Sequence, residues 1–280
     1  MAPATVRELL LQAARDIAGE SPRADAELLL ADAMGTSRTW LIAHDDALVD
    51  AAPRARFHAT VARRREGEPV ALVLGRQEFW SLALELGTAT LVPRPDTERL
   101  VELALERLAP GAPADVLDLG TGSGAIALAI ASERPAARVT ATDTSPAALA
   151  VARGNAARLR LGIRFLQGDW FAPLQDERFH LVLSNPPYLA EDDPHLPALR
   201  HEPRAALVSG PTGIEALAAI CAAAPAHLRA GGWLLLEHGD TQAAQVRALL
   251  HNAGFAGVGT WKDIEGRDRA SGGQWTSAGD

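Results

Sequence analysis

Apolar residues in the first part of the chain recur with the 3.6-residue period of an α-helix. Four stretches carry this period: residues 6–17, 22–34, 37–44 and 50–66. Glycines, which favour helix ends, follow two of them, at Gly35 and Gly67. The pattern predicts a small helical bundle, which we place at residues 1–69.

A different pattern covers residues 70–92. Short β-prone runs alternate there with turn residues, among them Gly75 and Gly87. The runs are residues 70–74, 78–86 and 88–92. Such runs predict a β-hairpin, which we expect to link the helical bundle to the rest of the chain.

From residue 93 onward, strand-like and helix-like patterns alternate. Five apolar runs are interpreted as strands: residues 115–119, 138–143, 164–168, 180–184 and 233–237. A closing antiparallel pair over residues 255–275 brings the expected sheet to seven strands. Alternating strands and helices are typical of a mostly parallel sheet with helices on both faces. We therefore predict an α/β, Rossmann-like domain over residues 93–280.

The first of these strands leads into a glycine-rich loop, Gly120-Thr121-Gly122-Ser123-Gly124, and a helical pattern follows the loop. Glycines let the backbone turn tightly and approach a ligand closely. The next predicted strand ends at Asp143, whose carboxylate can accept hydrogen bonds from both hydroxyls of a ribose. This order of elements favours a nucleotide-type cofactor over a plain tight turn.

The third predicted strand is followed by Asp169 and Trp170. A carboxylate at this position can accept a hydrogen bond from an adenine amino group, and an indole can pack on the adenine ring. An ordinary core position for Trp170 is an equally good interpretation.

The fourth predicted strand runs into Asn185-Pro186-Pro187-Tyr188, the most specific chemical signal in the chain. Asn185 offers a side-chain carbonyl, and the prolines present backbone carbonyls without competing N–H donors. Two such acceptors can hold both hydrogens of an –NH2 group and orient its lone pair. Tyr188 offers a flat face to a planar group. We assign catalysis to Asn185, Pro186 and Tyr188, acting on a planar, conjugated nitrogen.

The composition of the chain restricts the binding partners and the cellular compartment that we expect. The net charge is −8 and the estimated pI is about 5.5, whereas tight nucleic-acid binding requires basic groups. The single cysteine, Cys221, excludes an internal disulfide. No signal-peptide pattern, no run of roughly 20 apolar residues and no cluster with metal-ligand spacing is visible. We expect a cytoplasmic protein without a bound metal or a membrane anchor.

The glycine loop and the Asn-Pro-Pro-Tyr motif together resemble amino-methyltransferases that use S-adenosylmethionine. Their surroundings resemble the narrower HemK/PrmC family of protein-(glutamine-N5) methyltransferases, which act on peptide-chain release factors. The segments that carry this resemblance are Glu78-Phe79-Trp80, residues 91–98, Gly168-Asp169-Trp170, His201-Glu202-Pro203 and residues 235–239. The resemblance covers residues from about 70 to 270, and the helical bundle also fits it.

The resemblance implies a class I methyltransferase domain whose substrate is the glutamine in the Gly-Gly-Gln loop of release factors. The helical domain would dock part of the release factor. Cofactor contacts are expected from Gly120, Thr121, Gly122, Ser123, Gly124, Asp143, Asp169, Trp170 and Asn185. Substrate contacts are expected from Asn185, Pro186, Pro187, Tyr188, Pro93, Arg94 and Phe79.

Three alternatives remain open. A nucleic-acid amino-methyltransferase would share the chemistry and differ in its partner, and the acidic composition disfavours it. A catalytically silent cofactor-binding protein would be expected to lack Asn185 or Tyr188, and both are present. A nicotinamide oxidoreductase would carry the glycine spacing G-x-G-x-x-G, whereas this loop reads G-x-G-x-G. The match of Gly272-Gly273-Gln274 to the expected substrate tripeptide is interpreted as coincidence.

Overall fold

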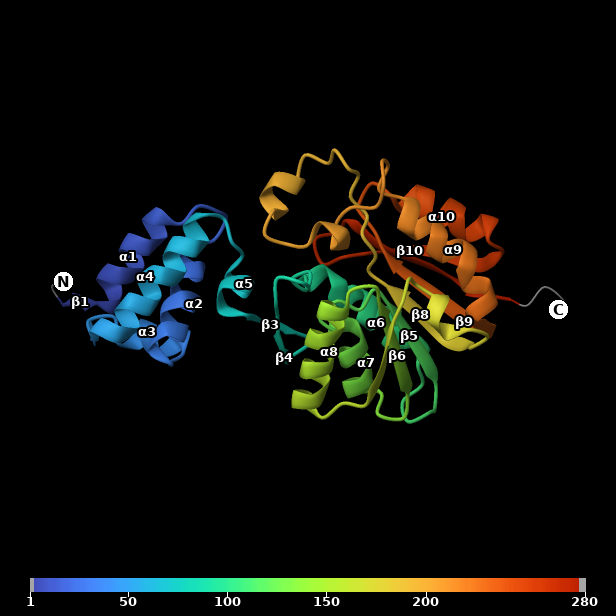
Figure 1. The fold of residues 1–280 in the computed structure, drawn as a ribbon, viewed down its shortest axis with the longest axis horizontal. Coiled ribbons are helices and arrows are strands. Elements are labelled where there is room, and N and C mark those ends of the chain that lie inside the picture. The colour runs from blue at the N-terminus through green and yellow to red at the C-terminus, as the bar shows by residue number, and fades with distance from the viewer. Residues whose placement is uncertain (1–2, 277–280) are drawn as a thin grey trace. The chain divides into compact units, whose positions relative to one another are not determined.

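A computed structural model of the protein describes residues 3–276 (Figure 1). The chain forms two compact units, Met1–Arg76 and Gln77–Asp280. Within the described residues, no helix is both long enough and apolar enough to cross a membrane.

The first unit is a helical bundle with one very short strand pair. Its elements are β1 (Ala4–Thr5), α1 (Val6–Asp16), α2 (Pro22–Met34), α3 (Arg38–Ala43), β2 (Leu48–Val49), α4 (Ala51–Arg65) and α5 (Val70–Leu74). The four predicted helices are confirmed as α1 to α4. Local signals fix their ends: Thr5 and Glu8 form a reciprocal capping box on α1, and Gly35 ends α2 in the left-handed conformation.

The prediction for the segment after α4 was wrong in two respects. Residues 70–74 form helix α5 rather than a β-prone run, and residues 88–92 form no strand. Pro69 and Gly75 cap α5, while Val73 packs into the core of the helical bundle, so tertiary packing overrides the β propensity of these residues. The compact unit accordingly continues to Arg76, beyond the predicted boundary at residue 69.

The second unit contains a two-stranded hairpin and a seven-stranded sheet. Its strands are β3 (Arg76–Phe79), β4 (Leu82–Glu85), β5 (Asp115–Leu119), β6 (Arg138–Asp143), β7 (Ile163–Gln167), β8 (Phe179–Ser184), β9 (Leu228–Glu237), β10 (Phe255–Lys262) and β11 (Asp268–Trp275). Strands β3 and β4 form the hairpin. The sheet order is β10-β11-β9-β8-β5-β6-β7, and β11 alone is antiparallel to both neighbours. The mostly parallel seven-stranded prediction is confirmed.

Helices cover both faces of this sheet (Figure 1). They are α6 (Glu98–Arg107), α7 (Ala125–Glu133), α8 (Pro146–Leu159), α9 (Glu215–His227) and α10 (Ala243–Asn252), with short 3₁₀ turns η1 (Pro95–Thr97), η2 (Ala172–Leu174), η3 (Leu196–Leu199) and η4 (Arg204–Ala206). Side chains alternate between the faces of each strand. On β8, Leu181 and Leu183 join the core with α6 and α7, whereas Val182 joins the core with α9 and α10.

The Gly-Gly-Gln tripeptide near the end of the chain lies inside β11, between β9 and β10. A Cβ atom on Gly272 would lie 2.4 Å from the carbonyl oxygen of Leu234, so only glycine fits at this close strand approach. The Gln274 side-chain nitrogen donates to the carbonyl of Gly231. The tripeptide therefore has a structural role in the sheet, within the antiparallel pair predicted over residues 255–275.

Candidate active site

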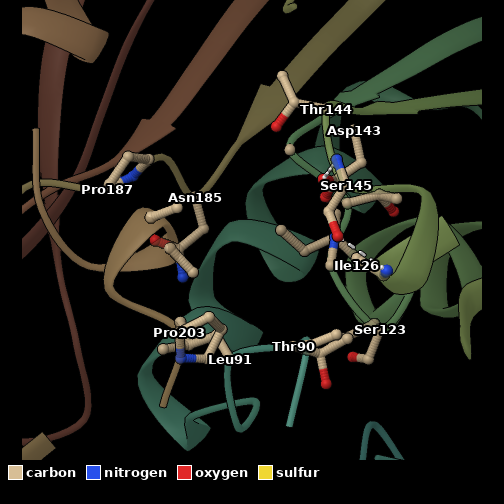
Figure 2. A pocket seen from close by; sticks show the side chains of 18 of the residues that line it. Thr90, Leu91, Ser123, Ile126, Asp143, Thr144, Ser145, Asn185, Pro187 and Pro203 are labelled. Carbon is tan, nitrogen blue, oxygen red and sulfur yellow. Dashed lines mark hydrogen bonds between the residues drawn. The ribbon is translucent and has the colours of Figure 1, made fainter. Parts of the chain in front are cut away.

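A cavity of about 350 Å³ lies at the carboxyl ends of β5, β6, β7 and β8 (Figure 2). The loops after these strands supply one part of its lining, and residues from segments 89–97 and 203–206 supply the rest. Ligands bind at this edge of open α/β sheets because the carboxyl ends of parallel strands meet there. The volume is in the range of small-molecule sites.

The glycine loop after β5 forms one side of the cavity. Gly120 and Gly122 have φ values of +70° and +56°, a conformation that strongly favours glycine. Gly122 donates its backbone N–H to Oδ2 of Asp143 at 2.9 Å. Gly124 does not line the cavity; a Cβ there would lie 3.0 Å from Leu128 Cδ1, so Gly124 allows the loop and helix α7 to pack closely.

Asp143 ends β6 and organises the loops around it. Its Oδ1 accepts from the backbone N–H of Ser145 at 2.8 Å, while its Oδ2 accepts from Gly122. Ser145 in turn caps α8 by accepting from the N–H of Ala148. Each carboxylate oxygen can accept a second hydrogen bond, so Asp143 retains acceptor capacity for a ligand in the cavity that it lines.

Trp170 and Asp169 also line the cavity, at the end of β7. Trp170 has a left-handed backbone, with φ of +45°, and a Cβ on Gly120 would lie 3.3 Å from its ring. Thr142 fixes this conformation by donating its hydroxyl hydrogen to the carbonyl of Trp170. The indole therefore lies over the glycine loop, where it can pack against an aromatic ligand.

Asp118 lies beneath the loop and is 1% exposed. Its Oδ2 accepts from the Thr121 hydroxyl and from the backbone N–H of Ala127, and its Oδ1 has no hydrogen-bond partner within residues 3–276. Burial raises the pKa of Asp118 to about 7, although both hydrogen bonds favour the charged form. Asp118 thus ties the loop to helix α7 rather than facing a ligand.

The Asn-Pro-Pro-Tyr turn forms the opposite side. Figure 2 shows Asn185 and Pro187 across the cavity from Asp143 and Ser145. The Asn185 amide nitrogen donates to the hydroxyl oxygen of Thr97 at 3.2 Å. Thr97 is the N-cap of α6 by position, but its side chain makes no capping hydrogen bond to a backbone N–H.

Pro186 and Tyr188 do not line this cavity. The Tyr188 carbonyl accepts from the side chain of Gln242 at 3.0 Å, which anchors the end of the turn. Burial, followed by the charge of Glu237, raises the pKa of Tyr188 to about 12. The Tyr188 phenol therefore stays protonated at neutral pH.

A further wall is held by Glu202, a buried residue to which the sequence assigned no role. It accepts from the backbone N–H of Val92 at 2.9 Å and forms an ion pair with Arg94. These contacts join a segment containing Pro93 to one containing Pro203, and both prolines line the cavity. The motif His201-Glu202-Pro203 contributes to the family resemblance. The sequence alone does not reveal the contacts of Glu202, because Val92 and Arg94 lie about 110 positions earlier in the chain.

The structure brings most, but not all, predicted site residues together. Those on the cavity are Gly120, Thr121, Gly122, Ser123, Asp143, Asp169, Trp170, Asn185, Pro187 and Pro93. Arg94 instead forms the ion pair with Glu202. Phe79 is 1% exposed and belongs to the core beneath α6 and α7, so the structure does not support a substrate contact for it. The motif Glu78-Phe79-Trp80 carries the resemblance but does not indicate whether the Phe79 side chain faces the core or the cavity.

The residues around the cavity fit S-adenosylmethionine. The Asp143 carboxylate has acceptor capacity for ribose hydroxyls, and Trp170 presents an aromatic surface. Gly122 also lines the cavity, and a Cβ atom added there would have no other atom within 4 Å. Within the part of the chain that the structure describes, no group of three or more His, Cys, Asp or Glu side chains could hold a metal ion.

Comparison with known proteins supports this interpretation. Residues 98–202 match the methyltransferase small domain family, and residues 8–75 match the PrmC N-terminal domain family. The chain is 52% identical over 252 residues to the release factor glutamine methyltransferase of Xylella fastidiosa strain Temecula1, covering 89% of this chain and 92% of that protein. It is 51% identical over 281 residues to that of Burkholderia pseudomallei, covering 97% and 96%.

Solved structures show the same fold. A methyltransferase from Pyrococcus furiosus aligns with a TM-score of 0.55 at 18% identity, covering 78% of this chain and 98% of that one. A Thermus thermophilus 16S rRNA N2 G1207 methyltransferase aligns with a TM-score of 0.53 at 21% identity, covering 71% and 49%. Fold and cavity together define a class I methyltransferase that uses S-adenosylmethionine. The chain belongs to the family of release factor glutamine methyltransferases.

Proposed function

We propose that the protein transfers a methyl group from S-adenosylmethionine to the side-chain amide nitrogen of the glutamine in the Gly-Gly-Gln motif of peptide-chain release factors. The observation that carries this proposal is the position of Asn185. Its amide lines the cavity across from Asp143, so a group held by Asn185 would face a cofactor held by Asp143.

The chemistry requires an acceptor for the substrate –NH2 group and a site with little water. When bound, S-adenosylmethionine supplies an electrophilic methyl group, which the amide nitrogen takes with its lone pair before losing a proton, leaving S-adenosylhomocysteine. Asn185 Oδ1 would accept one amide hydrogen, and we assign the second acceptor to the carbonyl of Pro186, the next residue of the turn, although Pro186 does not itself line the cavity. Pro187 and Pro203 line the cavity with apolar surface that limits water.

Cofactor binding is assigned to the opposite side of the cavity. Asp143 would accept from the ribose hydroxyls and Trp170 would pack on the adenine, while Asp169 would accept from the adenine amino group. Gly120 and Gly122 would allow the backbone to approach the ligand. These roles follow the lining of the cavity and the hydrogen bonds of Asp143.

We assign the helical unit to docking of the release factor. Its surface includes the exposed apolar side chains of Ile42 and Leu48, at 67% and 64% exposure, together with Leu11 at 48%. Because release factors act in translation, we also propose that the protein works in the cytoplasm.

The alternative of a nucleic-acid substrate finds little support in the helical unit. Residues 63–65 form a run of three arginines at the end of α4, where free guanidinium groups would favour contacts with phosphate. Arg63 instead pairs with Glu68 and donates to the carbonyl of Val73, and Arg64 pairs with Asp25. At least two of the three guanidinium groups are therefore already bound within the unit and are not free phosphate contacts.

Transfer of radiolabelled methyl from S-adenosylmethionine to three acceptors tests the proposal. The acceptors are a purified release factor, the same factor with its Gly-Gly-Gln glutamine changed to alanine, and ribosomal RNA. We expect label only in the unmodified release factor. Label in the RNA with none in either protein would overturn the substrate assignment while leaving the fold and cofactor in place.

A further inference from the structure

Glu237 is a buried carboxyl group that the proposed mechanism does not use. It is the last residue of β9, next to the strand that carries the Asn-Pro-Pro-Tyr turn, since Leu236 pairs with Ser184 in the parallel β8–β9 register. The residue is 2% exposed. A charged side chain is seldom so buried unless polar partners compensate for its loss of water.

The partners of Glu237 come from the start of helix α6 and from the Asn-Pro-Pro-Tyr turn itself. Hydrogen bonds with the side chains of Thr97 and Asn185 favour its charged form, and burial opposes them and raises the pKa of Glu237 to about 7. Oε2 of Glu237 has no hydrogen-bond partner within residues 3–276. The other titratable groups that act on it are Arg269 and Asp96, and its charge is felt in turn at Tyr188.

These contacts bear on which way the Asn185 amide points. An asparagine side chain presents two donors on nitrogen and an acceptor on oxygen, and a half-turn about its last torsion exchanges them. The Asn185 nitrogen donates to the Thr97 hydroxyl oxygen at 3.2 Å, on the same side as Glu237. Because Asn185 also lines the cavity, its carbonyl oxygen is available to a ligand there.

We propose that Glu237 and Thr97 are positioning residues, which hold the Asn185 amide with its nitrogen inward and its carbonyl oxygen toward the glutamine amide of the substrate. This inference rests on the proposed function. An ionised carboxylate can only accept hydrogen bonds, so it accommodates the Asn185 –NH2 group and repels the Asn185 oxygen. The Thr97 hydroxyl can donate a hydrogen bond to Glu237 while it accepts one from Asn185. The hydrogen bonds then run in one direction, from Asn185 through Thr97 to Glu237.

The alternative is a purely structural role, in which Glu237 and Thr97 only tie β9 to the start of α6. The two roles differ in what a near-isosteric change does. A glutamine in place of Glu237 can donate to the Asn185 oxygen and so permits the reversed amide. A valine in place of Thr97 keeps the shape and removes the hydroxyl. Both changes spare the glycine loop and Asp143, which are assigned to the cofactor.

Steady-state kinetics on a release factor at pH about 8.5, where Glu237 is ionised, test the inference. For Glu237→Gln and Thr97→Val we expect kcat to fall by about tenfold or more, with the calorimetric Kd for S-adenosylmethionine changed by less than about threefold. Thr97→Ser keeps the hydroxyl and should recover most of the kcat lost in Thr97→Val. Thr140→Val, at a buried threonine of β6 outside the cavity, is the matched control and should retain wild-type kcat.

A second measurement does not depend on the substrate. The side-chain ¹⁵N–¹H signals of Asn185, assigned by their loss in Asn185→Ala, should show slow hydrogen exchange in the wild type and faster exchange in both variants. Lowered stability with unchanged kcat and unchanged exchange would overturn the positioning role. A wild type inactive on release factors, with the predicted Asn185 signals, would refute the proposed function and leave the positioning role supported.

Discussion

The carboxyl group of Asp118 should make the stability of the second unit depend on pH. Burial raises the pKa of Asp118 from 3.8 to about 7. Between these values the folded state keeps a proton that the unfolded state has released. The folded state therefore binds more protons, and the free energy of unfolding must fall as the pH rises from about 4 to about 7. Above pH 7 the contribution of Asp118 stays constant.

The size of this effect follows from the pKa difference. One pKa unit is worth about 1.4 kcal/mol, so the rise at Asp118 corresponds to on the order of 4 kcal/mol. Asp118→Asn removes the titration and keeps an oxygen that can accept from Thr121 and Ala127. Its new –NH2 group would lie where Oδ1 has no partner within residues 3–276, at a pH-independent cost of about 1–3 kcal/mol.

Urea denaturation at several pH values, followed by tryptophan fluorescence, measures this effect. Five of the six tryptophans lie in the second unit, and a Trp40→Phe background removes the signal of the first. We expect the stability of Asp118→Asn relative to its background to improve by about 4 kcal/mol between pH 4 and pH 8. Glu237 titrates in the same direction, but it is present in both proteins and cancels. Parallel stability curves for the two proteins would refute the reasoning.

Three further predictions follow from the cavity and the core. Gly122→Ala forces alanine into a left-handed conformation at a cost of about 1–2 kcal/mol, so calorimetry should show roughly tenfold weaker S-adenosylmethionine binding; Gly154→Ala in helix α8, where a Cβ meets open space at ordinary φ, should leave binding unchanged. Glu202→Ala leaves the Val92 N–H without its acceptor and should cost about 1–3 kcal/mol in urea denaturation, with Glu202→Gln less harmful because it keeps an acceptor. Burial raises the pKa of Cys221 to about 12, so a thiol reagent at neutral pH should label it only after unfolding.

Local patterns were sufficient to predict the parallel sheet and its functional edge. Each parallel strand is an apolar run between turn residues, and residues 115–119 and 138–143 match β5 and β6 at both ends. The glycine loop and the Asn-Pro-Pro-Tyr turn follow strand ends directly, and parallel topology then brings them to one cavity. When candidate functional residues directly follow the ends of parallel strands, the sequence alone predicts that they lie at one edge of the sheet.

Local patterns failed where distant segments decide the outcome. The apolar composition of Val70–Leu74 suits a strand or a helix, and packing in the helical bundle selects the helix. The ion pair of Arg94 with Glu202 joins residues 108 positions apart, and the bond between Asn185 and Thr97 spans 88 positions. No periodicity encodes such pairs, so the sequence analysis missed these supporting contacts, although most of the residues predicted for the site line the cavity.

The central claim is methylation of the release-factor glutamine by a site in which Asn185 holds the amide. Mass spectrometry of a purified release factor, after incubation with the protein and S-adenosylmethionine, tests it most directly. We predict a mass gain of one methyl group on the glutamine of the Gly-Gly-Gln motif, and no gain with Asn185→Ala although that variant still binds the cofactor. No gain with the wild type, or an equal gain with Asn185→Ala, would contradict the claim.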